Sequence, residues 1–250
     1  MKDTSWEKVS SKYNKNLADK GDYYHLNLVI PKSLELLKLN ENSKVLDLAC
    51  GQGVLARHLP KNTSYLGIDL SESLIEFAKK YEIQSNHSFI VGDITKPLNI
   101  GSQTFTHSTI ILALQNTGKV ANVLFNAAKY IKKGGKLLIV INHPHYRIPR
   151  HSSWEIDEKN NIQYRKINKY LSKIEIPVNH DPSKGAKGNF SISYHFSLES
   201  LSKDLFEAGF YIEKIEEWSS DKKSVGKNSK RENVSRSEIP LFMCLLCTKN

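Results

Sequence analysis

The chain has 250 residues, of which 39% are hydrophobic and 25% charged, and its formal net charge is +10. This composition is that of a globular protein and argues against a disordered chain. No apolar run approaches the roughly 20 residues that span a bilayer, and the N-terminus has no apolar signal core. We therefore expect one cytoplasmic domain over residues 1–250, with no membrane partner.

Helix-like and strand-like patterns alternate along the first part of the chain. Residues 1–40 are predicted to form a helical segment. Short apolar runs at 43–49, 64–70, 87–94, 107–114 and 136–143 predict buried strands. Three helices are expected between these strands. The first starts at Val54 and ends by Pro60, and the second follows an N-cap at Ser71. The third covers 119–135, with Gly134 as its stop. Such alternation favours a parallel sheet covered on both faces.

The pattern breaks after Asn142. Residues 143–196 contain short strand-like pieces and no long helix. The segment is longer than a connection between two elements of an α/β domain needs to be, so we interpret it as an inserted cap. Ser197 is then a good N-cap for a helix that stops at Gly209. Residues 210–218 and 239–249 predict two final strands, and the polar, basic stretch 219–238 between them predicts a mobile loop.

Two cysteines form a C-x-x-C pair, Cys244 and Cys247, a spacing that zinc sites and redox pairs use. They lie in a predicted strand, where positions three apart point to opposite faces. The chain also has no second Cys/His pair at zinc-finger spacing. We interpret both as buried small hydrophobic side chains and predict no metal site.

Much of the positive charge lies late in the chain. Residues 143–190 hold nine Lys/Arg against five Asp/Glu, and 219–238 hold six against three. Such segments are typical either of a solvated basic surface or of a surface that binds an anionic partner.

The stretch Val45–Gly53, VLDLACGQG, combines an acid with a glycine turn at the end of a predicted strand. Glycine allows positive φ and lets a ligand approach the backbone closely. The next two strands also end in acids, Asp69 and Asp93. In open α/β sheets ligands bind beyond the carboxyl ends of the strands, where an acid can accept from ribose hydroxyls or from an adenine amino group. Three acids in register with a glycine turn are hard to explain as separate solvated caps.

The turn also matches the NAD fingerprint G-x-G-x-x-[G/A], with Ala56 as its third position. Three observations count against a dinucleotide. About forty residues precede the turn, and a buried carboxylate at Asp47 would repel a pyrophosphate while favouring an amino group or a sulfonium. Asp93 is also well placed for the adenine of a mononucleoside-like ligand, and the NAD fingerprint does not require an acid there.

The sequence resembles the class I S-adenosylmethionine-dependent methyltransferases. Residues 45–53 resemble the glycine-rich motif of that family, and 65–80, 89–94 and 110–116 resemble its next three motifs. One departure is Ala49-Cys50, where many members have glycine. The region HPxxRIPRxSSW after Asn142 also resembles a bacterial group of these enzymes whose substrate is unsettled. The resemblance implies an α/β, Rossmann-like seven-stranded sheet, mostly parallel with an antiparallel last strand, with helices on both faces and the cap after strand five.

The resemblance also implies a site for S-adenosylmethionine. The glycine turn would border the methionine part, the acid after the second strand would take the ribose, and the acid after the third would hold the adenine. Tyr24 and His25, just before the first core helix, are hypothesised to reach the methionine carboxylate. The cofactor-binding residues would be Asp47, Cys50, Gly51, Gly53, Asp69, Leu70, Asp93, Ile94, Ala113, Leu114, Tyr24 and His25.

The methyl acceptor is expected near the ends of the fourth and fifth strands. His143 is the preferred general base, because it lies at a strand end over the expected site, although a structural histidine fits the same position. Two arginines and a tryptophan nearby could grip an acidic or aromatic substrate, or could seat the cap. The substrate candidates are Gln115, Asn116, Asn142, His145, Tyr146, Arg147, Arg150 and Trp154.

Four functions remain open from the sequence. A small-molecule methyltransferase comes first, because a cap after strand five tends to enclose a substrate. An RNA or DNA methyltransferase would use the basic cap and the 219–238 stretch, but no extra RNA-binding motif is recognisable. A non-enzymatic S-adenosylmethionine-binding protein is third, and an NAD-dependent enzyme is a distant fourth.

Overall fold

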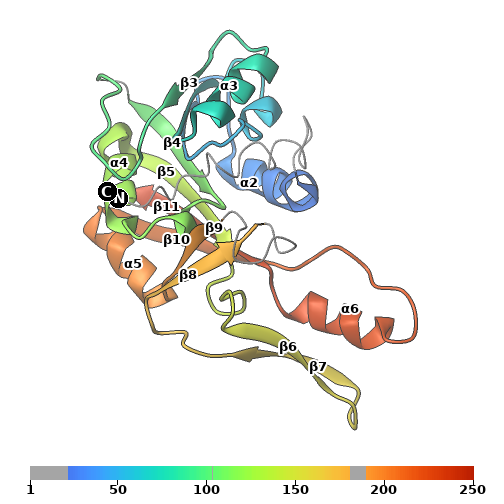
Figure 1. The fold of residues 1–250 in the computed structure, drawn as a ribbon. Helices are drawn as coiled ribbons and strands as arrows, with labels where there is room; N and C mark the ends of the chain where they lie inside the picture. The colour runs from blue at the N-terminus through green and yellow to red at the C-terminus, as the bar shows by residue number, and fades with distance from the viewer. Residues whose placement is uncertain (1–21, 103, 181–189) are drawn as a thin grey trace.

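The fold is built on one seven-stranded sheet (Figure 1). The computed structural model describes residues 22–102, 104–180 and 190–250. The strand order is β10-β11-β5-β4-β1-β2-β3. The strands are β1 (Lys44–Leu48), β2 (Ser64–Asp69), β3 (His87–Val91), β4 (Phe105–Ile111), β5 (Ile131–Asn142), β10 (Phe210–Trp218) and β11 (Phe242–Lys249).

Six of these strands run the same way. The pairs β1–β2, β1–β4, β2–β3 and β4–β5 are parallel, whereas β11 is antiparallel to both β5 and β10. This confirms the predicted sheet with its antiparallel last strand. The chain leaves β1 toward β2 on one side and returns as β4 on the other, so the order reverses between β1 and β4. Ligands of open α/β sheets bind outside the carboxyl ends at such a switch.

Helices cover both faces of the sheet, as predicted (Figure 1). Helices α4 (Val120–Tyr130) and α5 (Leu198–Glu207) bury apolar side chains in the large cluster on one face. The π-helical turn η1 (His25–Val29), α2 (Ile30–Leu37) and α3 (Glu72–Tyr81) pack against the other. The predicted caps are confirmed, since Ser71 accepts a hydrogen bond from Leu74 N and Ser197 accepts one from Ser200 N. The part of the 1–40 helix prediction that falls on residues 1–21 lies outside the described residues.

Two helix predictions were wrong in extent. The predicted helix 119–135 ends at Tyr130, because Ile131 already pairs with Phe105 as the start of β5. A bulge then lets β4 resume its pairing at His107–Lys136, and Gly134 turns there with φ +74°. The helix expected from Val54 is only a 3₁₀ turn, η2 (Ala56–His58), since Pro60 follows within a turn.

In the part of 143–196 that the structure describes, two pairs of strands lie outside the main sheet (Figure 1). The first pairs β6 (Ser152–Asp157) with β7 (Ile162–Ile167), and the second pairs β8 (Ile174–Asn179) with β9 (Phe190–His195). The mobile loop predicted over 219–238 was wrong for its second half, which is helix α6 (Ser229–Glu238). Buried Arg231 ties this helix to Glu158, beyond the end of β6, at 2.8 Å, and that partner is 73 positions away in the sequence.

The C-x-x-C pair lies in β11, as the strand interpretation required. Both thiols are buried, and Cys244 belongs to the cluster on one face of the sheet while Cys247 belongs to the cluster on the other. Their opposite directions confirm the interpretation as core side chains. Within the described part of the chain, no helix has the length and apolar character needed to cross a membrane.

The glycine turn after β1 contains an alanine in a conformation that favours glycine. Ala49 has φ +62°. In this left-handed region a Cβ atom costs roughly 1 to 2 kcal/mol, so the departure Ala49-Cys50 places strain in the turn.

We predict that Ala49→Gly raises the free energy of unfolding by up to about 1 kcal/mol, because relief of this strain exceeds the added freedom of the unfolded chain. The matched control is Gly134→Ala, at φ +74° with no heavy atom near the new Cβ, which should destabilise by about as much. Urea unfolding of both variants measures this, and a less stable Ala49→Gly protein would contradict it.

Candidate functional site

Asp47 is a buried carboxyl group in the middle of the sheet. It is 3% exposed, at the carboxyl end of β1. Tyr65 Oη donates to its Oδ2 and Thr109 Oγ1 donates to its Oδ1, each at 2.7 Å. Burial raises the pKa of Asp47 to about 6, although both hydroxyl donors oppose the shift. The carboxyl group at the switch point of the sheet is therefore harder to ionise than a carboxyl group in water.

The glycine turn that follows opens onto free space. Gly51 has φ +54°, and a Cβ built on it would meet no heavy atom within 4 Å. On its other side the turn is tightly packed, since a Cβ on Gly53 would lie 2.9 Å from the Phe89 ring. Gly67 in β2 leaves the room that the Cys50 thiol occupies, because a Cβ there would come within 2.7 Å of Sγ. The backbone at Gly51 is thus exposed to a ligand while its neighbours are fixed.

Asp69 ends β2 beside this turn. Its Oδ2 accepts from Gly51 N and its Oδ1 from Ser71 N, both at 2.9 Å. The side chain therefore fixes the glycine turn and the start of α3 at once. Leu70, which follows, is 53% exposed at the same edge.

Asp93 follows β3 in a tight turn. Its Oδ1 accepts from the backbone N and the hydroxyl of Thr95, and Lys96 Nζ lies 3.1 Å from its Oδ2. Although its partial burial opposes the shift, these donors together lower the pKa of Asp93, so the group is ionised at neutral pH. The turn is held from α4 by Asn126, whose amide donates to the carbonyl oxygens of Ile94 and Lys96. Sequence reasoning missed Asn126, a buried polar residue in an otherwise apolar helix face.

The backbone after β4 turns sharply. Leu112 has φ +53°, and the 3₁₀ turn η3 (Leu114–Asn116) follows. Leu114 is fully buried and Ala113 is partly buried, so of these two residues only Ala113 has surface that a ligand could reach. Gln115 donates from Nε2 to Leu112 O, while its Oε1 is buried without a partner in the described residues. Asn116 is partly buried in the same turn.

Of the two N-terminal candidates, Tyr24 lies beside the start of β11. Tyr24 Oη is 2.9 Å from Ser220 Oγ, and its ring packs edge-on to Phe242. His25 Nδ1 is buried without a hydrogen bond in the described residues, 3.9 Å from the Asp22 carboxylate. Their role at a methionine carboxylate stays a prediction.

His143 is held on both sides of its ring. Its Nδ1 accepts from the backbone N of His145 and of Tyr146, at 3.2 and 3.4 Å, and its Nε2 donates to Glu217 Oε1 at 2.6 Å. Burial lowers the pKa of His143, an effect that Glu217 opposes. The ring is therefore neutral near pH 7, but both nitrogens are engaged within the protein. A base role stays a prediction and requires one of these bonds to open.

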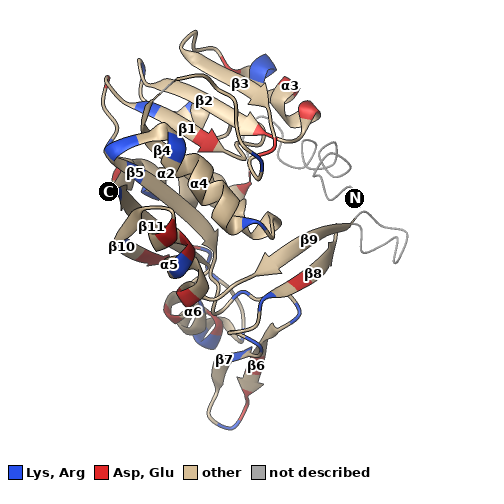
Figure 2. Ribbon diagram, turned by 90° about the vertical axis from the view of Figure 1, so that its left-hand side faces the viewer, with Lys and Arg blue, Asp and Glu red and all other residues tan. Residues whose placement is uncertain are grey.

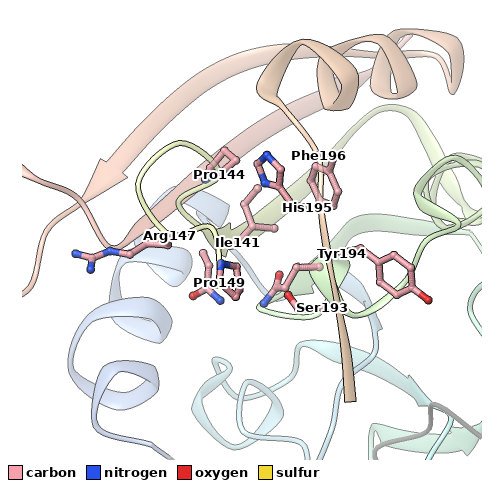
Figure 3. A pocket seen from close by; sticks show the side chains of 10 residues that line it. Ile141, Pro144, Arg147, Pro149, Ser193, Tyr194, His195 and Phe196 are labelled. Carbon is pink, nitrogen blue, oxygen red and sulfur yellow. The ribbon is translucent and has the colours of Figure 1, made fainter. Parts of the chain in front are cut away.

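A pocket lies between the turn after β4, the end of β5 and the end of β9 in the cap (Figure 3). The cavity itself has a volume of about 30 Å³, and it opens into a wider space that is partly solvent. Tyr194 of β9 seats the cap, since a Cβ on Gly118 would come within 2.7 Å of its ring. The lining residues are Gln115, Ile141, Asn142, Pro144, Arg147, Pro149, Ser193, Tyr194, His195 and Phe196.

Only some of the predicted substrate residues line the pocket. Asn142 and Arg147 line the pocket, whereas Arg150 is exposed with φ +61° and does not. The rings of His145 and Tyr146 are in contact at a tilt of 50°, with 4.8 Å between their centroids. The guanidinium groups of Arg147 and Arg165 both lie over the Trp154 ring, at 5.5 and 5.2 Å.

Sequence reasoning missed several residues of the site. Tyr65, Thr109 and Arg165 are each brought in by strand register, which the sequence does not give. Gln52 could have been predicted from the sequence as a site residue, because it is a polar residue between the two glycines of the turn. Its side chain is 1% exposed, and neither amide atom has a partner in the described residues. Those residues also contain no group of three His, Cys, Asp or Glu that could hold a metal.

Comparison with known proteins places this arrangement in a family. A family model described as "Methyltransferase domain" matches residues 39–184, more than half of the chain. The chain belongs to the methyltransferase domain family. The matched segment begins just before β1 and includes the glycine turn, the three acids and the cap strands β6, β7 and β8.

Individual relatives match shorter parts of the chain than the family model does. The chain is 32% identical over 110 residues to a demethylmenaquinone methyltransferase of Thermotoga maritima, and this aligned region covers 43% of this chain and 47% of that protein. It is 30% identical over 105 residues to a sterol 24-C-methyltransferase of Debaryomyces hansenii, covering 40% and 28%. The chain thus spans less than half of either relative.

A solved structure of an S-adenosylmethionine-dependent methyltransferase from Mesorhizobium loti has the same fold. Its TM-score is 0.67 at 24% identity, covering 87% of this chain and 96% of that one. At this identity the likeness concerns the fold, and it agrees with the strand order described above.

Removing the charge of Asp47 should stabilise the protein when no ligand is bound. Because the folded-state pKa is raised, the contribution of Asp47 to stability is present below about pH 4 and is lost as pH rises through 6. Asp47→Asn should therefore raise the free energy of unfolding at pH 8 by about 1 to 3 kcal/mol and leave it nearly unchanged at pH 4. Asp93→Asn, whose carboxyl pKa is lowered instead, should destabilise at pH 8. Equal effects of the two variants in urea unfolding would contradict this.

The hydrogen bonds of His143 should contribute measurably to stability. His143→Ala removes three of them and should cost about 1 to 3 kcal/mol in the free energy of unfolding. Glu217→Gln is the matched control, since its amide oxygen still accepts from Nε2, and should cost less than about 1 kcal/mol. If both variants unfold at the same denaturant concentration as the original protein, the histidine is not held as described.

Proposed function

We propose that this chain is an S-adenosylmethionine-dependent methyltransferase whose acceptor is a small molecule. The observation that carries the proposal is the row of three carboxyl groups at the ends of β1, β2 and β3, beside a turn whose backbone opens at Gly51. Family membership supports methyl transfer. The relatives named for a sterol and a demethylmenaquinone support a small acceptor.

The residues present fit this cofactor on structural grounds. The open side of Gly51 and the unpartnered amide of Gln52 leave room and hydrogen-bonding capacity at the turn. Asp47, Cys50, Gly51 and Gly53 would border the methionine part, where a cationic group favours an acid. Asp69 and Leu70 would hold the ribose, Asp93 and Ile94 the adenine, and the backbone of Ala113 the sulfonium side. When bound, the cofactor supplies a methyl group that is already activated by the sulfonium.

The work left to the protein is to position the acceptor and exclude water. The pocket beneath the cap supports this, because it lies over the ends of β4 and β5, next to β1. In this proposal Asn142 and Arg147 contact the acceptor, and His143 serves as base if the acceptor carries a proton to be removed.

A nucleic-acid acceptor receives less support from the distribution of charge. Figure 2 shows Lys and Arg interspersed with Asp and Glu over β6, β7 and α6. Arg231 is paired with Glu158, and Arg236 lies 3.9 Å from Glu232. Acidic partners among the basic side chains weaken the field that attracts a phosphate backbone.

The proposal predicts transfer of a labelled methyl group from S-adenosylmethionine into a small-molecule fraction of cell extract. The label should appear in material that passes a low-mass filter, and nuclease treatment should not reduce it. Asp69→Asn should lower the affinity for S-adenosylmethionine at least about tenfold, because it removes a charged acceptor of the ribose hydroxyls. The matched control is Glu213→Gln, an exposed acid on β10 that pairs with Lys136 away from the site.

Three results would contradict the proposal. Label in nuclease-sensitive material would favour the nucleic-acid alternative. Cofactor binding without transfer to any fraction would favour a binding protein. Tighter calorimetric binding of NAD than of S-adenosylmethionine would favour a dinucleotide enzyme.

A further inference from the structure

One edge of the main sheet has no partner strand in the part of the chain that the structure describes. That edge is β3, which ends the strand order beside β2 (Figure 1). The strand reads HSFIV and has no Lys, Asp, Glu or Pro, the residues that commonly keep an edge strand from pairing. Ser88 and Val91 are exposed on it. The edge is therefore open to a further strand.

The direction of the backbone groups at this edge follows from the pairing of β3 with β2. Asn86 O accepts from the β2 strand and Gly92 N donates to it, so the even positions of β3 face β2. Because successive backbone groups of a strand point to opposite edges, positions 87, 89 and 91 face outward. Among the described residues, the backbone groups of Phe89 and Val91 have no partner at the outer edge.

Helix α3 and the outer edge of β3 enclose a groove with a volume of about 280 Å³. None of its lining residues comes from β2; they are Lys79, Glu82, Gln84, His87, Ser88 and Phe89. Ile83, between two of these residues, is 94% exposed, and Val91 at the other end of the strand is 51% exposed. Two apolar side chains are thus left in solvent, one at each end of the unpaired edge.

The flank of α3 beside this groove carries acids at its start and a lysine at its end. Lys79 lines the groove, and Glu76 and Glu72 lie one and two turns before it on the same flank. All three are exposed, and no ion-pair partner lies within 4.0 Å of them in the described residues. Phe89 shares a buried cluster with Ala78, so Glu76 and Lys79 lie on either side of the level of Phe89.

We infer that the chain forms a two-fold dimer in which β3 pairs antiparallel with β3 of a second copy, centred on Phe89. In this register His87 lies opposite Val91 of the second copy, so every outward-facing position meets another outward-facing position. Two seven-stranded sheets then become one continuous sheet. This inference concerns assembly and does not depend on the proposed function.

A second copy fits this edge because the charged and apolar side chains around it are complementary to themselves. The two α3 helices would run antiparallel, so Glu76 of each copy faces Lys79 of the other, and two such pairs form. Ile83 of each copy lies near Val91 of the other, which covers the apolar side chains at both ends of the strand. An unrelated strand would satisfy the backbone groups of β3 but not these side chains.

Sedimentation equilibrium of the full chain over a range of concentrations tests the inference. The mass should rise toward twice the 28.4 kDa of one chain. Val91→Lys places two charges at the shared edge of each dimer and should raise the dimer Kd at least about tenfold. The matched control is Val234→Lys, 57% exposed on α6, which should change it less than about twofold. A mass that stays at one copy, or equal effects of the two variants, would overturn the inference.

Charge reversal at low ionic strength tests the register separately, with surface substitutions that leave the core of the fold untouched. Glu76→Lys and Lys79→Glu should each raise the dimer Kd about three- to tenfold, because each brings like charges together at two places. Combining the two reversals restores both pairs and should return the Kd to within about twofold of the original. If neither single reversal weakens the dimer, or if the combined variant is weaker than both, the register is wrong.

A disulfide between copies checks which positions lie opposite each other. In the proposed register Ser88 lies opposite Ile90 of the second copy, where Cβ atoms are about 5 Å apart. A mixture of Ser88→Cys and Ile90→Cys proteins should form disulfide-linked dimers faster than either protein alone. The three natural cysteines are buried and do not compete. Cross-linking that is no faster in the mixture would contradict the pairing.

Discussion

The buried carboxyl group of Asp47 is the constraint on which the rest of the site depends. It lies on the central strand β1, and its two oxygens accept from hydroxyl groups on the neighbouring strands β2 and β4. Thr109 is the direct partner of Asp47 in the β1–β4 register. These two bonds link β1 to both of its neighbours at the switch point of the sheet. The glycine turn then starts from a rigid strand end.

The buried carboxyl group of Asp47 lowers the stability of the unliganded protein at neutral pH. A carboxyl group whose pKa is raised to about 6 by burial is held ionised at neutral pH only against its surroundings. A cation nearby would offset that cost. The alanine with positive φ in the same turn adds strain at the same place. Strain and unfavourable charge that persist in a native structure are typical of sites that a ligand completes.

Local patterns were enough to predict most of the fold. Apolar runs located the seven strands, and Ser71 and Ser197 marked two helix starts through bonds within three residues. The three acids could be grouped because parallel strands end at one edge. The end of α4 could not be predicted, since Ile131 joins β5 through pairing with Phe105. Helix α6 was missed because it has little amphipathic pattern and is tied to Glu158 by a distant ion pair.

The residues of the candidate site were predictable from the sequence only where local patterns identify them. Residues next to strand ends were predicted as candidates, whereas those that arrive through register were not. Arg165 faces Trp154 only because β6 and β7 pair as they do. Gln115 was named only as one polar residue of several, and its unpartnered oxygen depends on how η3 packs beneath β9.

The most direct test of the central claim is the number of protons released when S-adenosylmethionine binds, measured by calorimetry in buffers of different ionisation enthalpy. If a cationic ligand next to Asp47 lowers its pKa from about 6, binding at pH 6 should release about half a proton and binding at pH 8 almost none. Asp47→Asn should abolish the release at pH 6. Binding at pH 6 without proton release, or with equal release in Asp47→Asn, would contradict the account.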